Sequence, residues 1–192
     1  MHAEILAQLK SLNCHGMAAA WNEISADVAK LGAETTLQRL LLAETAERLA
    51  RSLNYQLKTA KFPIHRDFTD FSWDDIALAQ NHIEKLAGAD FTETAQNLIL
   101  VGGTGTGKTH IATALGVSAI HHGKRVRFFN VVDLVNQLQR EKQQDKTGAI
   151  AKKLLHADVV ILDELGYLPF PESGGALLFH LISQLYERTS LI

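Results

Sequence analysis

Four residues near the middle of the sequence have the types and the spacing of a phosphate-binding loop. Gly102, Gly107, Lys108 and Thr109 fit the pattern G-x-x-x-x-G-K-[ST], and they follow the apolar run 98–101. Glycines let the backbone curl so that successive N–H groups and the start of the next helix point at one anion. The lysine then reaches the β- and γ-phosphates, and the threonine hydroxyl ligates Mg²⁺. The pattern therefore predicts a nucleoside triphosphate site.

A second group of residues that could take part in chemistry is the adjacent carboxylate pair Asp163 and Glu164, which follows the apolar run 159–162. Taken alone, such a pair is more often only the polar end of a buried strand, because the chain returns to water there. Together with a phosphate loop the pair has specific roles. Asp163 fits the second magnesium contact of P-loop ATPases. Glu164 can polarise the attacking water as a general base, a role typically worth about 10²- to 10⁴-fold. We therefore predict Glu164 and Lys108 as the catalytic residues.

The elements that must position these residues alternate between strands and helices. The apolar runs at 98–101 and 159–162 and the segment 125–129 predict three strands, and the helix after the loop is expected to end at Gly123. Alternating strands and helices imply a parallel sheet with its ligand site at the carboxyl ends of the strands. The phosphate loop and the Asp163–Glu164 pair are then expected at the same edge of the sheet.

The first sixty or so residues have helical patterns only. Apolar residues from Met17 to Leu31 recur on one helical face, and Gly32 follows as a stop signal. A capping-box pattern predicts that a second helix starts near Thr36. A connector that contains Pro63 then leads to the alternating region. We expect an α-helical N-terminal region over 1–66 and an α/β core over 67–192.

The second predicted helix carries a basic stripe interrupted by an aromatic residue. The stripe recurs at spacings of 3, 4 and 3 and consists of Arg48, Arg51, Tyr55 and Lys58. This combination suits contact with nucleic-acid phosphates and bases. The alternative is an ordinary solvated helix face.

Composition narrows the classes of protein further. The single cysteine, Cys14, cannot form an internal disulfide, so a reducing cytoplasm is the expected compartment. The sequence has no apolar run long enough to span a membrane. The net charge is only −2, but residues 37–66 hold six cations against two carboxylates, which is a local charge of +4. This asymmetry favours a nucleic-acid partner.

Nearly the whole chain resembles the IstB/DnaC family of AAA+ ATPases, and most closely the IstB-like ATP-binding helper proteins of bacterial insertion sequences. The segments "LKSLNCHGMAAAWNE" and "LLLAETAERLARSLNYQLKTAKFP" are similar to the helical N-terminal region of that family. Its phosphate loop is matched by "LVGGTGTGKTHIATALG", and its magnesium strand and next helix by "ADVVILDELGYLPF" and "GGALLFHLISQLYERTSLI". The run from Asp163 to Pro169 is the most specific element. Gly103 and Thr104 stand where relatives often carry prolines.

The resemblance implies a fold, cofactors and contact residues. The fold is a P-loop NTPase (AAA+) three-layer parallel sheet preceded by a small α-helical region, and the cofactors are ATP and Mg²⁺. Metal contacts are expected at Thr109 and Asp163. Nucleotide contacts are expected along the loop and the first helical turn, at Gly102, Gly103, Thr104, Gly105, Thr106, Gly107, Lys108, Thr109 and His110.

The resemblance also implies a function, an ATP-dependent helper of DNA transposition that binds double-stranded DNA and directs a partner transposase. Candidate DNA contacts are the stripe on the second helix and the cations in the segment from Asp133 to His156, namely Lys142, Lys146, Lys152 and Lys153. A solvated helix face remains the alternative for these lysines. Two other functions stay open, a helicase loader resembling DnaC and a non-catalytic remnant that binds nucleotide.

The resemblance further predicts a sheet that is incomplete at its C-terminal end. The sequence finishes at "YERTSLI", where the family begins a core strand that lies between the phosphate-loop strand and the Asp-Glu strand. A polar sensor, an arginine finger and a second sensor would come after that point. We therefore expect this chain to be impaired in hydrolysis and in AAA+ self-association, with unpaired sheet edges.

Overall fold

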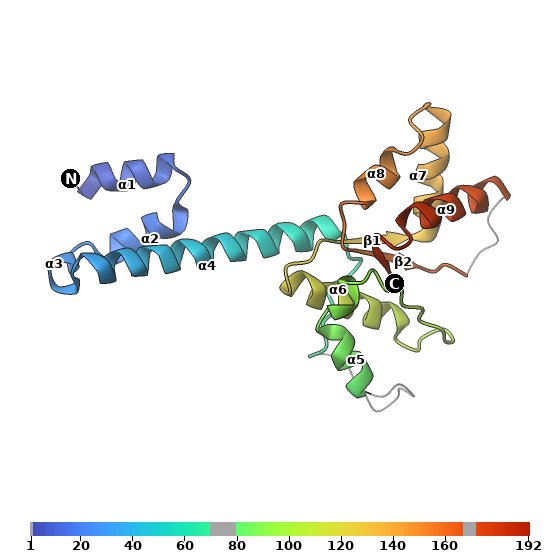
Figure 1. The fold of residues 1–192 in the computed structure, drawn as a ribbon, viewed down its shortest axis with the longest axis horizontal. Helices are drawn as coiled ribbons and strands as arrows, with labels where there is room; N and C mark the ends of the chain where they lie inside the picture. Colours follow the sequence, from blue (N-terminus) through green and yellow to red (C-terminus); the bar gives the residue numbers. More distant parts are fainter. Residues whose placement is uncertain (1, 70–79, 167–171) are drawn as a thin grey trace. The chain divides into compact units, whose positions relative to one another are not determined.

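The computed structural model describes residues 2–69, 80–166 and 172–192. The last part of the run from Asp163 to Pro169 lies outside these residues. The chain divides into two compact units, Met1–Tyr55 and Gln56–Ile192. Figure 1 shows the elements of each unit. In the part of the chain that the structure describes, no helix combines the length and the apolar character needed to cross a lipid bilayer.

The first unit is helical, as predicted, but its helices have different limits. It contains α1 (His2–Ser11), α2 (His15–Ile24), α3 (Val28–Leu31) and the larger part of α4 (Ala33–Ala60). The single helix expected up to Leu31 is therefore broken after Ile24, whereas Gly32 does end α3, with φ of 78°. Helix α4 starts before the expected position near Thr36, whose hydroxyl donates to the Gly32 carbonyl (2.7 Å) from inside the helix.

Helices α2 and α4 cross at very short range. A Cβ atom placed on Gly16 would lie 2.4 Å from the carbonyl oxygen of Ala43, a distance that real Cβ atoms essentially never show. Gly16 is therefore required by the backbone of α4 rather than by its own dihedral angles. The close approach places the start of α2 directly over the α4 backbone at Ala43 and Glu44.

The second unit is an α/β layer structure built on a parallel sheet. Its strands have the order β1-β2-β3 and follow one another with helices between them (Figure 1). In chain order the elements after α4 are α5 (Gln80–Ala87), a 3-10 turn (Asp90–Thr92), α6 (Lys108–His121), β1 (Val126–Asn130), α7 (Val131–Gln143), α8 (Ala149–Leu154), β2 (Val159–Asp163), α9 (Glu172–Leu185) and β3 (Ser190–Leu191).

Successive residues of β2 serve the two faces of the sheet, as the pleat requires. Val160 is fully buried in an aliphatic core with α7, α8 and α9, which includes Leu134 and Leu181. Ile161 points to the other face, where a Cβ on Gly116 of α6 would lie 2.8 Å from its Cδ1 atom. Helices thus cover both faces of a parallel sheet, which confirms the predicted three-layer fold.

The strand predicted at 98–101 is not a strand in the structure. The Leu98 N–H donates to the Leu191 carbonyl (2.8 Å), so this segment lies on the side of β3 that faces away from β2. Because β3 has only two residues, it offers 99–101 no ladder of hydrogen bonds. Ile99 and Val101 are 84% and 90% exposed. The position of β3 between β2 and the segment that leads to the loop is nevertheless the position that the resemblance to AAA+ ATPases implies.

Arg125 and Asp158 form an ion pair just before strands β1 and β2. From this pair we predict that the stability of the protein depends on pH. Arg125 donates to Asp158 through its backbone N–H (2.7 Å), Nε (3.1 Å) and Nη2 (3.1 Å). Burial by itself raises the pKa of Asp158, but the hydrogen bonds from Arg125 outweigh it and hold this pKa below its ordinary value.

Replacing Arg125 with methionine is expected to cost about 1 kcal/mol of unfolding free energy at pH 7, a modest value because both side chains are partly exposed. Because the folded-state pKa of Asp158 is depressed, this contribution is present above the unfolded-state pKa of about 3.9. It disappears as the pH falls through the lower, folded-state pKa. Urea titrations of both proteins from pH 7 downward measure the difference. A gap that persisted below pH of about 2 would show that packing of the arginine stem is responsible.

Candidate nucleotide site

The loop between residue 101 and α6 has the backbone that its glycines allow. Gly105 and Gly107 have φ of 77° and 80°, which lie in the left-handed region where other residues are strained. Gly107 is the N-cap of α6, so the helix begins at Lys108 as the motif requires. A Cβ on Gly102 would lie 2.8 Å from Thr106 Oγ1, so a larger residue there would force the Thr106 side chain to shift. These glycines give the loop the kind of backbone in which amide groups and a helix start can face one anion.

The side chains of Thr106 and Lys108 both donate a hydrogen bond to one backbone carbonyl of the loop, that of Gly103. Lys108 Nζ donates to the Gly103 carbonyl (2.6 Å), and Thr106 Oγ1 donates to the same oxygen (2.9 Å). The loop from Gly102 to Thr106 is exposed. An incoming phosphate can therefore take the place of the Gly103 carbonyl as the partner of the Lys108 ammonium without displacing buried structure.

The structure brings together the predicted metal residues. Thr109 Oγ1 lies 3.1 Å from both carboxylate oxygens of Asp163, although the two residues are 54 positions apart in the sequence. Thr109 is in the first turn of α6, and Asp163 is the last residue of β2. A hydroxyl and a carboxylate are hard oxygen donors of the kind that Mg²⁺ takes, usually in small number, with phosphate and water completing the octahedron. These residues therefore fit a magnesium ion shared with a nucleotide.

Glu164, the predicted base, is held by a residue that the sequence patterns did not single out. Its backbone has φ of 66°, a strained value for a glutamate. Its Oε2 accepts a hydrogen bond from Asn130 Nδ2 (2.5 Å), while Asn130 Oδ1 accepts from the Val132 N–H (3.0 Å) and so caps α7. Asn130 ends β1 in register with Asp163 of β2. A polar residue at the end of the neighbouring predicted strand was the signal that could have found it.

His110, which we predicted as part of the nucleotide site, contacts the chain segment that contains Asp67. Its Nε2 lies 3.0 Å from the carbonyl oxygen of Asp67. Phe68, the next residue, packs against a buried cluster that includes Ile111 of α6. His110 therefore links the segment at Asp67 and Phe68 to the helix that follows the loop.

The cations predicted to contact DNA lie on two separate parts of the chain. Arg48 and Arg51 are on α4, where they form ion pairs with Glu44 and Glu47. Tyr55 on the same helix is 64% exposed. The lysines of the second group are exposed on α7, on α8 and in the loop between them, and they are Lys142, Lys146, Lys152 and Lys153.

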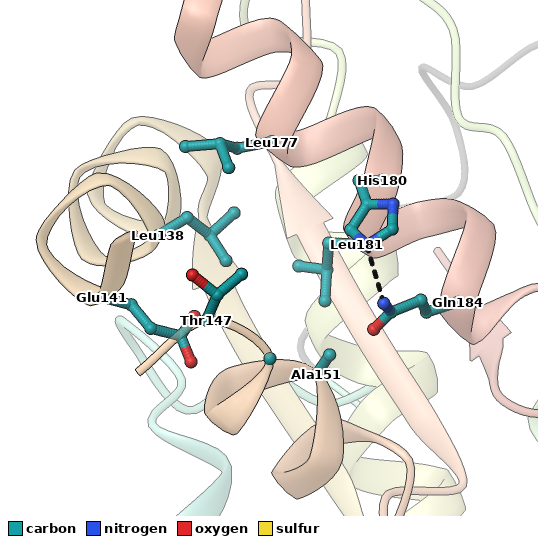
Figure 2. A pocket seen from close by; sticks show the side chains of 9 residues that line it. Leu138, Glu141, Thr147, Ala151, Leu177, His180, Leu181 and Gln184 are labelled. Carbon is teal, nitrogen blue, oxygen red and sulfur yellow. Dashed lines mark hydrogen bonds between the residues drawn. The ribbon is translucent and has the colours of Figure 1, made fainter. Parts of the chain in front are cut away.

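A small depression of about 20 Å³, partly open to solvent, lies between α7, α8 and α9 (Figure 2). On one side Glu141 Oε1 accepts from the Ile150 N–H (2.9 Å), so this largely buried carboxylate serves the start of α8. On the other side His180 and Gln184 of α9 are hydrogen-bonded (2.8 Å). None of the predicted nucleotide or DNA residues lines it, since the lining consists of Leu138, Glu141, Thr147, Gly148, Ala151, Leu177, His180, Leu181 and Gln184.

Comparison with solved structures finds two folds that are similar to that of this chain. The crystal structure of the DnaC helicase loader is 27% identical and superimposes with a TM-score of 0.53, covering 58% of this chain and 65% of that one. The structure of the replication initiator DnaA bound to AMPPCP and single-stranded DNA gives a TM-score of 0.56 at 21% identity, covering 67% of this chain and 41% of that one. The second likeness shows the fold alone.

Sequence comparison finds relatives among proteins of insertion sequences. The chain is 36% identical over 146 residues to the insertion sequence IS21 putative ATP-binding protein of Pseudomonas aeruginosa, covering 76% of this chain and 55% of that protein. It is 31% identical over 179 residues to the insertion sequence IS5376 putative ATP-binding protein of Geobacillus stearothermophilus, covering 92% and 71%. The chain thus spans only 55% of the length of the first of these relatives. Residues 7–192 match the model of the IstB-like ATP binding protein family, and the chain belongs to that family.

Proposed function

We propose that this chain binds ATP with Mg²⁺ and belongs to an ATP-dependent helper of DNA transposition, which acts on double-stranded DNA together with a transposase. Membership of an ATP-binding family supports the cofactor. Relatives that are ATP-binding proteins of insertion sequences support the process and the partner. Arg48, Arg51, Tyr55 and Lys58 on α4 and the lysines of α7 and α8 are the proposed DNA contacts.

The contact between Thr109 and Asp163 is the observation that carries the proposal. A glycine-rich loop or a strand-end carboxylate can each be purely structural, but here the hydroxyl at the end of the loop lies 3.1 Å from the carboxylate. The distance between the two halves is therefore already that of residues that share one ion and its ligands. The loop amides supply the anion site beside them.

The chemistry assigned to the chain's own residues follows from their positions. Lys108 exchanges the Gly103 carbonyl for the β- and γ-phosphates, and the start of α6 stabilises their charge. Mg²⁺, when bound, neutralises charge that develops on the phosphates. Glu164 accepts the proton of the attacking water, and Asn130 fixes the direction of its carboxylate. Departure of the γ-phosphate leaves ADP in the loop.

A second function, loading of a replicative helicase, is favoured by the likeness to the DnaC helicase loader. Both functions use the same nucleotide site, so they differ in the partner only. Binding measurements with purified replicative helicase and with purified transposase separate them. Stable binding to the helicase, with none to the transposase, would replace the first function with the second.

Replacing Lys108 with alanine tests nucleotide binding directly. Mg-ATP at 100 times its Kd should add about 2.7 kcal/mol to the unfolding free energy of the wild type. The variant should lose nearly all of this gain, because it lacks the Lys108 ammonium group, which would exchange the Gly103 carbonyl for phosphate. Thermal unfolding with and without Mg-ATP measures both values.

The matched control is Lys85→Ala, which removes an exposed lysine of α5 and should leave the shift unchanged. Absence of a shift in the wild type would rule out an assembled site. A shift without any phosphate release, even with DNA and transposase added, would assign the chain to the third possibility, a nucleotide-binding protein without catalysis.

A further inference from the structure

Two arginines of α4 look equivalent in the sequence, because each follows a glutamate by four residues. The pairs are Glu44–Arg48 and Glu47–Arg51. In the structure they differ in burial and in the donor atom. Arg48 uses Nε to bind Glu44 (2.7 Å), and the Glu44 side chain is 8% exposed. Arg51 uses Nη2 to bind Glu47 (3.0 Å), and the Glu47 side chain is 44% exposed. The first carboxylate is fixed within the unit, and the second is at the surface.

Glu44 is held in place by the start of α2. Its Oε2 accepts the Met17 N–H (3.2 Å), in the first turn of that helix. The crossing at Gly16 is so close that the α2 backbone there lies directly against the backbone of Ala43 and Glu44. These contacts fix the carboxylate independently of Arg48, which then binds to a rigid acceptor.

The charge of Glu44 is balanced from two sides. The hydrogen bond from Arg48 is the largest cause that holds the pKa of Glu44 below its ordinary value, and the bonds from the Met17 and Gly16 backbone act in the same direction against burial. The start of a helix carries about half a positive charge. Because α2 already offsets part of the carboxylate charge, Arg48 is not fully neutralised by its partner.

The bond through Nε also fixes the direction of the guanidinium plane. Arginine has five N–H donors in a planar fork, and the Nη hydrogens are not taken up by the Nε bond to Glu44. The Arg48 side chain is 62% exposed and has Cys14 as a second neighbour, so the guanidinium is accessible to solvent over part of its surface. A phosphate accepts such a pair of parallel N–H groups well. The geometry is that of an anion contact prepared before the anion arrives.

We propose that Arg48 is a preoriented contact for a nucleic-acid phosphate and that Glu44 is the residue that positions it. The proposal rests on the DNA binding proposed above and ranks the residues within it. Arg51, whose partner is exposed at the surface, contributes charge to the stripe but no fixed geometry. The two pairs therefore predict opposite results for the same chemical change.

The experiment uses the full chain and a fluorescent 30-base-pair duplex, with a single strand of the same length as the second probe. Binding is measured from about 50 to 300 mM salt. Arg48→Ala is expected to weaken duplex binding about tenfold and to reduce the salt slope by about one. Arg48→Lys should keep the salt slope, because the charge is retained, but it should lose most of the affinity. A single ammonium group cannot bind Glu44 with one nitrogen and present two parallel N–H groups to a phosphate. Arg51→Lys should change affinity by less than about twofold.

The decisive comparison is Glu44→Gln against Glu47→Gln. Both changes remove one negative charge, which alone would tighten binding to DNA. Glu47→Gln should therefore bind equally well or up to about twofold tighter. Glu44→Gln should bind about threefold more weakly, because the neutral amide gives up the charge-assisted bond that orients Arg48.

Tighter binding by Glu44→Gln, or equal affinity of Arg48→Lys and the wild type, would overturn the proposal and leave Glu44 as a neutralising partner only. Helical content and thermal unfolding are recorded for every variant. If Glu44→Gln unfolds, the lysine variant decides the question. No binding of either DNA probe by the wild type would reject the DNA role as a whole, whereas normal wild-type binding with unaffected Arg48 variants rejects this inference alone. If the Arg48 variants weaken binding of the single strand more than binding of the duplex, Arg48 remains the phosphate contact but the ligand is single-stranded DNA.

Discussion

Replacing Glu164 with glutamine is expected to preserve binding of Mg-ATP and to lower its turnover about 10²- to 10⁴-fold. Glutamine keeps the oxygen that accepts from Asn130 Nδ2, so the loop after β2 should keep its conformation. It cannot take a proton from water, and so the general base is lost. Phosphate release is measured under single-turnover conditions with protein in excess, because this format detects slow hydrolysis. Binding is measured separately from the thermal shift with Mg-ATP.

Glu187 provides a matched control for this change. It is an exposed glutamate that also has a positive φ (58°), but it follows α9 and lies outside the site. Glu187→Gln should leave both binding and turnover at the wild-type values. Unchanged hydrolysis by Glu164→Gln would show that another group activates the water. Loss of binding by Glu164→Gln would instead make this residue part of the nucleotide-binding geometry.

The largest expected loss of stability from a single methyl group is at Gly16. Gly16→Ala places a Cβ 2.4 Å from the carbonyl oxygen of Ala43, and neither backbone can yield without separating α2 from α4. Overpacking of this kind costs about 1–3 kcal/mol, and we expect the upper end because the opposing atom belongs to the backbone. Trp21 in α2 reports on this unit. Its fluorescence during urea unfolding, in a background where Trp73 is phenylalanine, measures the change.

Gly175 of α9 is the control for the helix propensity of the added methyl group. It is also a helical glycine, but no described atom lies within 4 Å of its Cβ position. Gly175→Ala should therefore be neutral or should stabilise the protein by about 0.5–1 kcal/mol. Equal behaviour of the two alanine variants would mean that the crossing of α2 and α4 opens readily in solution.

Local chemistry made part of the nucleotide region predictable from the sequence. A loop that surrounds a phosphate needs glycine at positions of positive φ, and Gly105 and Gly107 show why these residues cannot vary freely. The start of α6 at Lys108 follows from the same motif. The approach of Asp163 to Thr109 could be predicted because parallel strands end at one edge of a sheet. Each of these features depends on a few neighbouring residues or on a general property of the fold.

The features that could not be predicted depend on contacts between distant residues. Residues 98–101 have the composition of a strand, but a strand also needs a neighbour, and β3 offers only two residues. The break between α2 and α3 contains neither glycine nor proline as a signal. The residue type of Glu44 indicates a surface position, and Glu44 is buried only because α2 crosses over it. No pattern on a single element contains this information.

Asn130 places an unusual demand on the chemistry of one position. It must offer an oxygen to the Val132 N–H and a hydrogen to Glu164 at the same time. Aspartate would still cap α7, but it would oppose Glu164 with a second negative charge. Serine or threonine would also cap the helix, with a shorter reach toward the glutamate. A side-chain amide meets both requirements. Because the helix cap holds Oδ1 at the Val132 N–H, it also determines that the Nδ2 end of Asn130 is directed toward the proposed base.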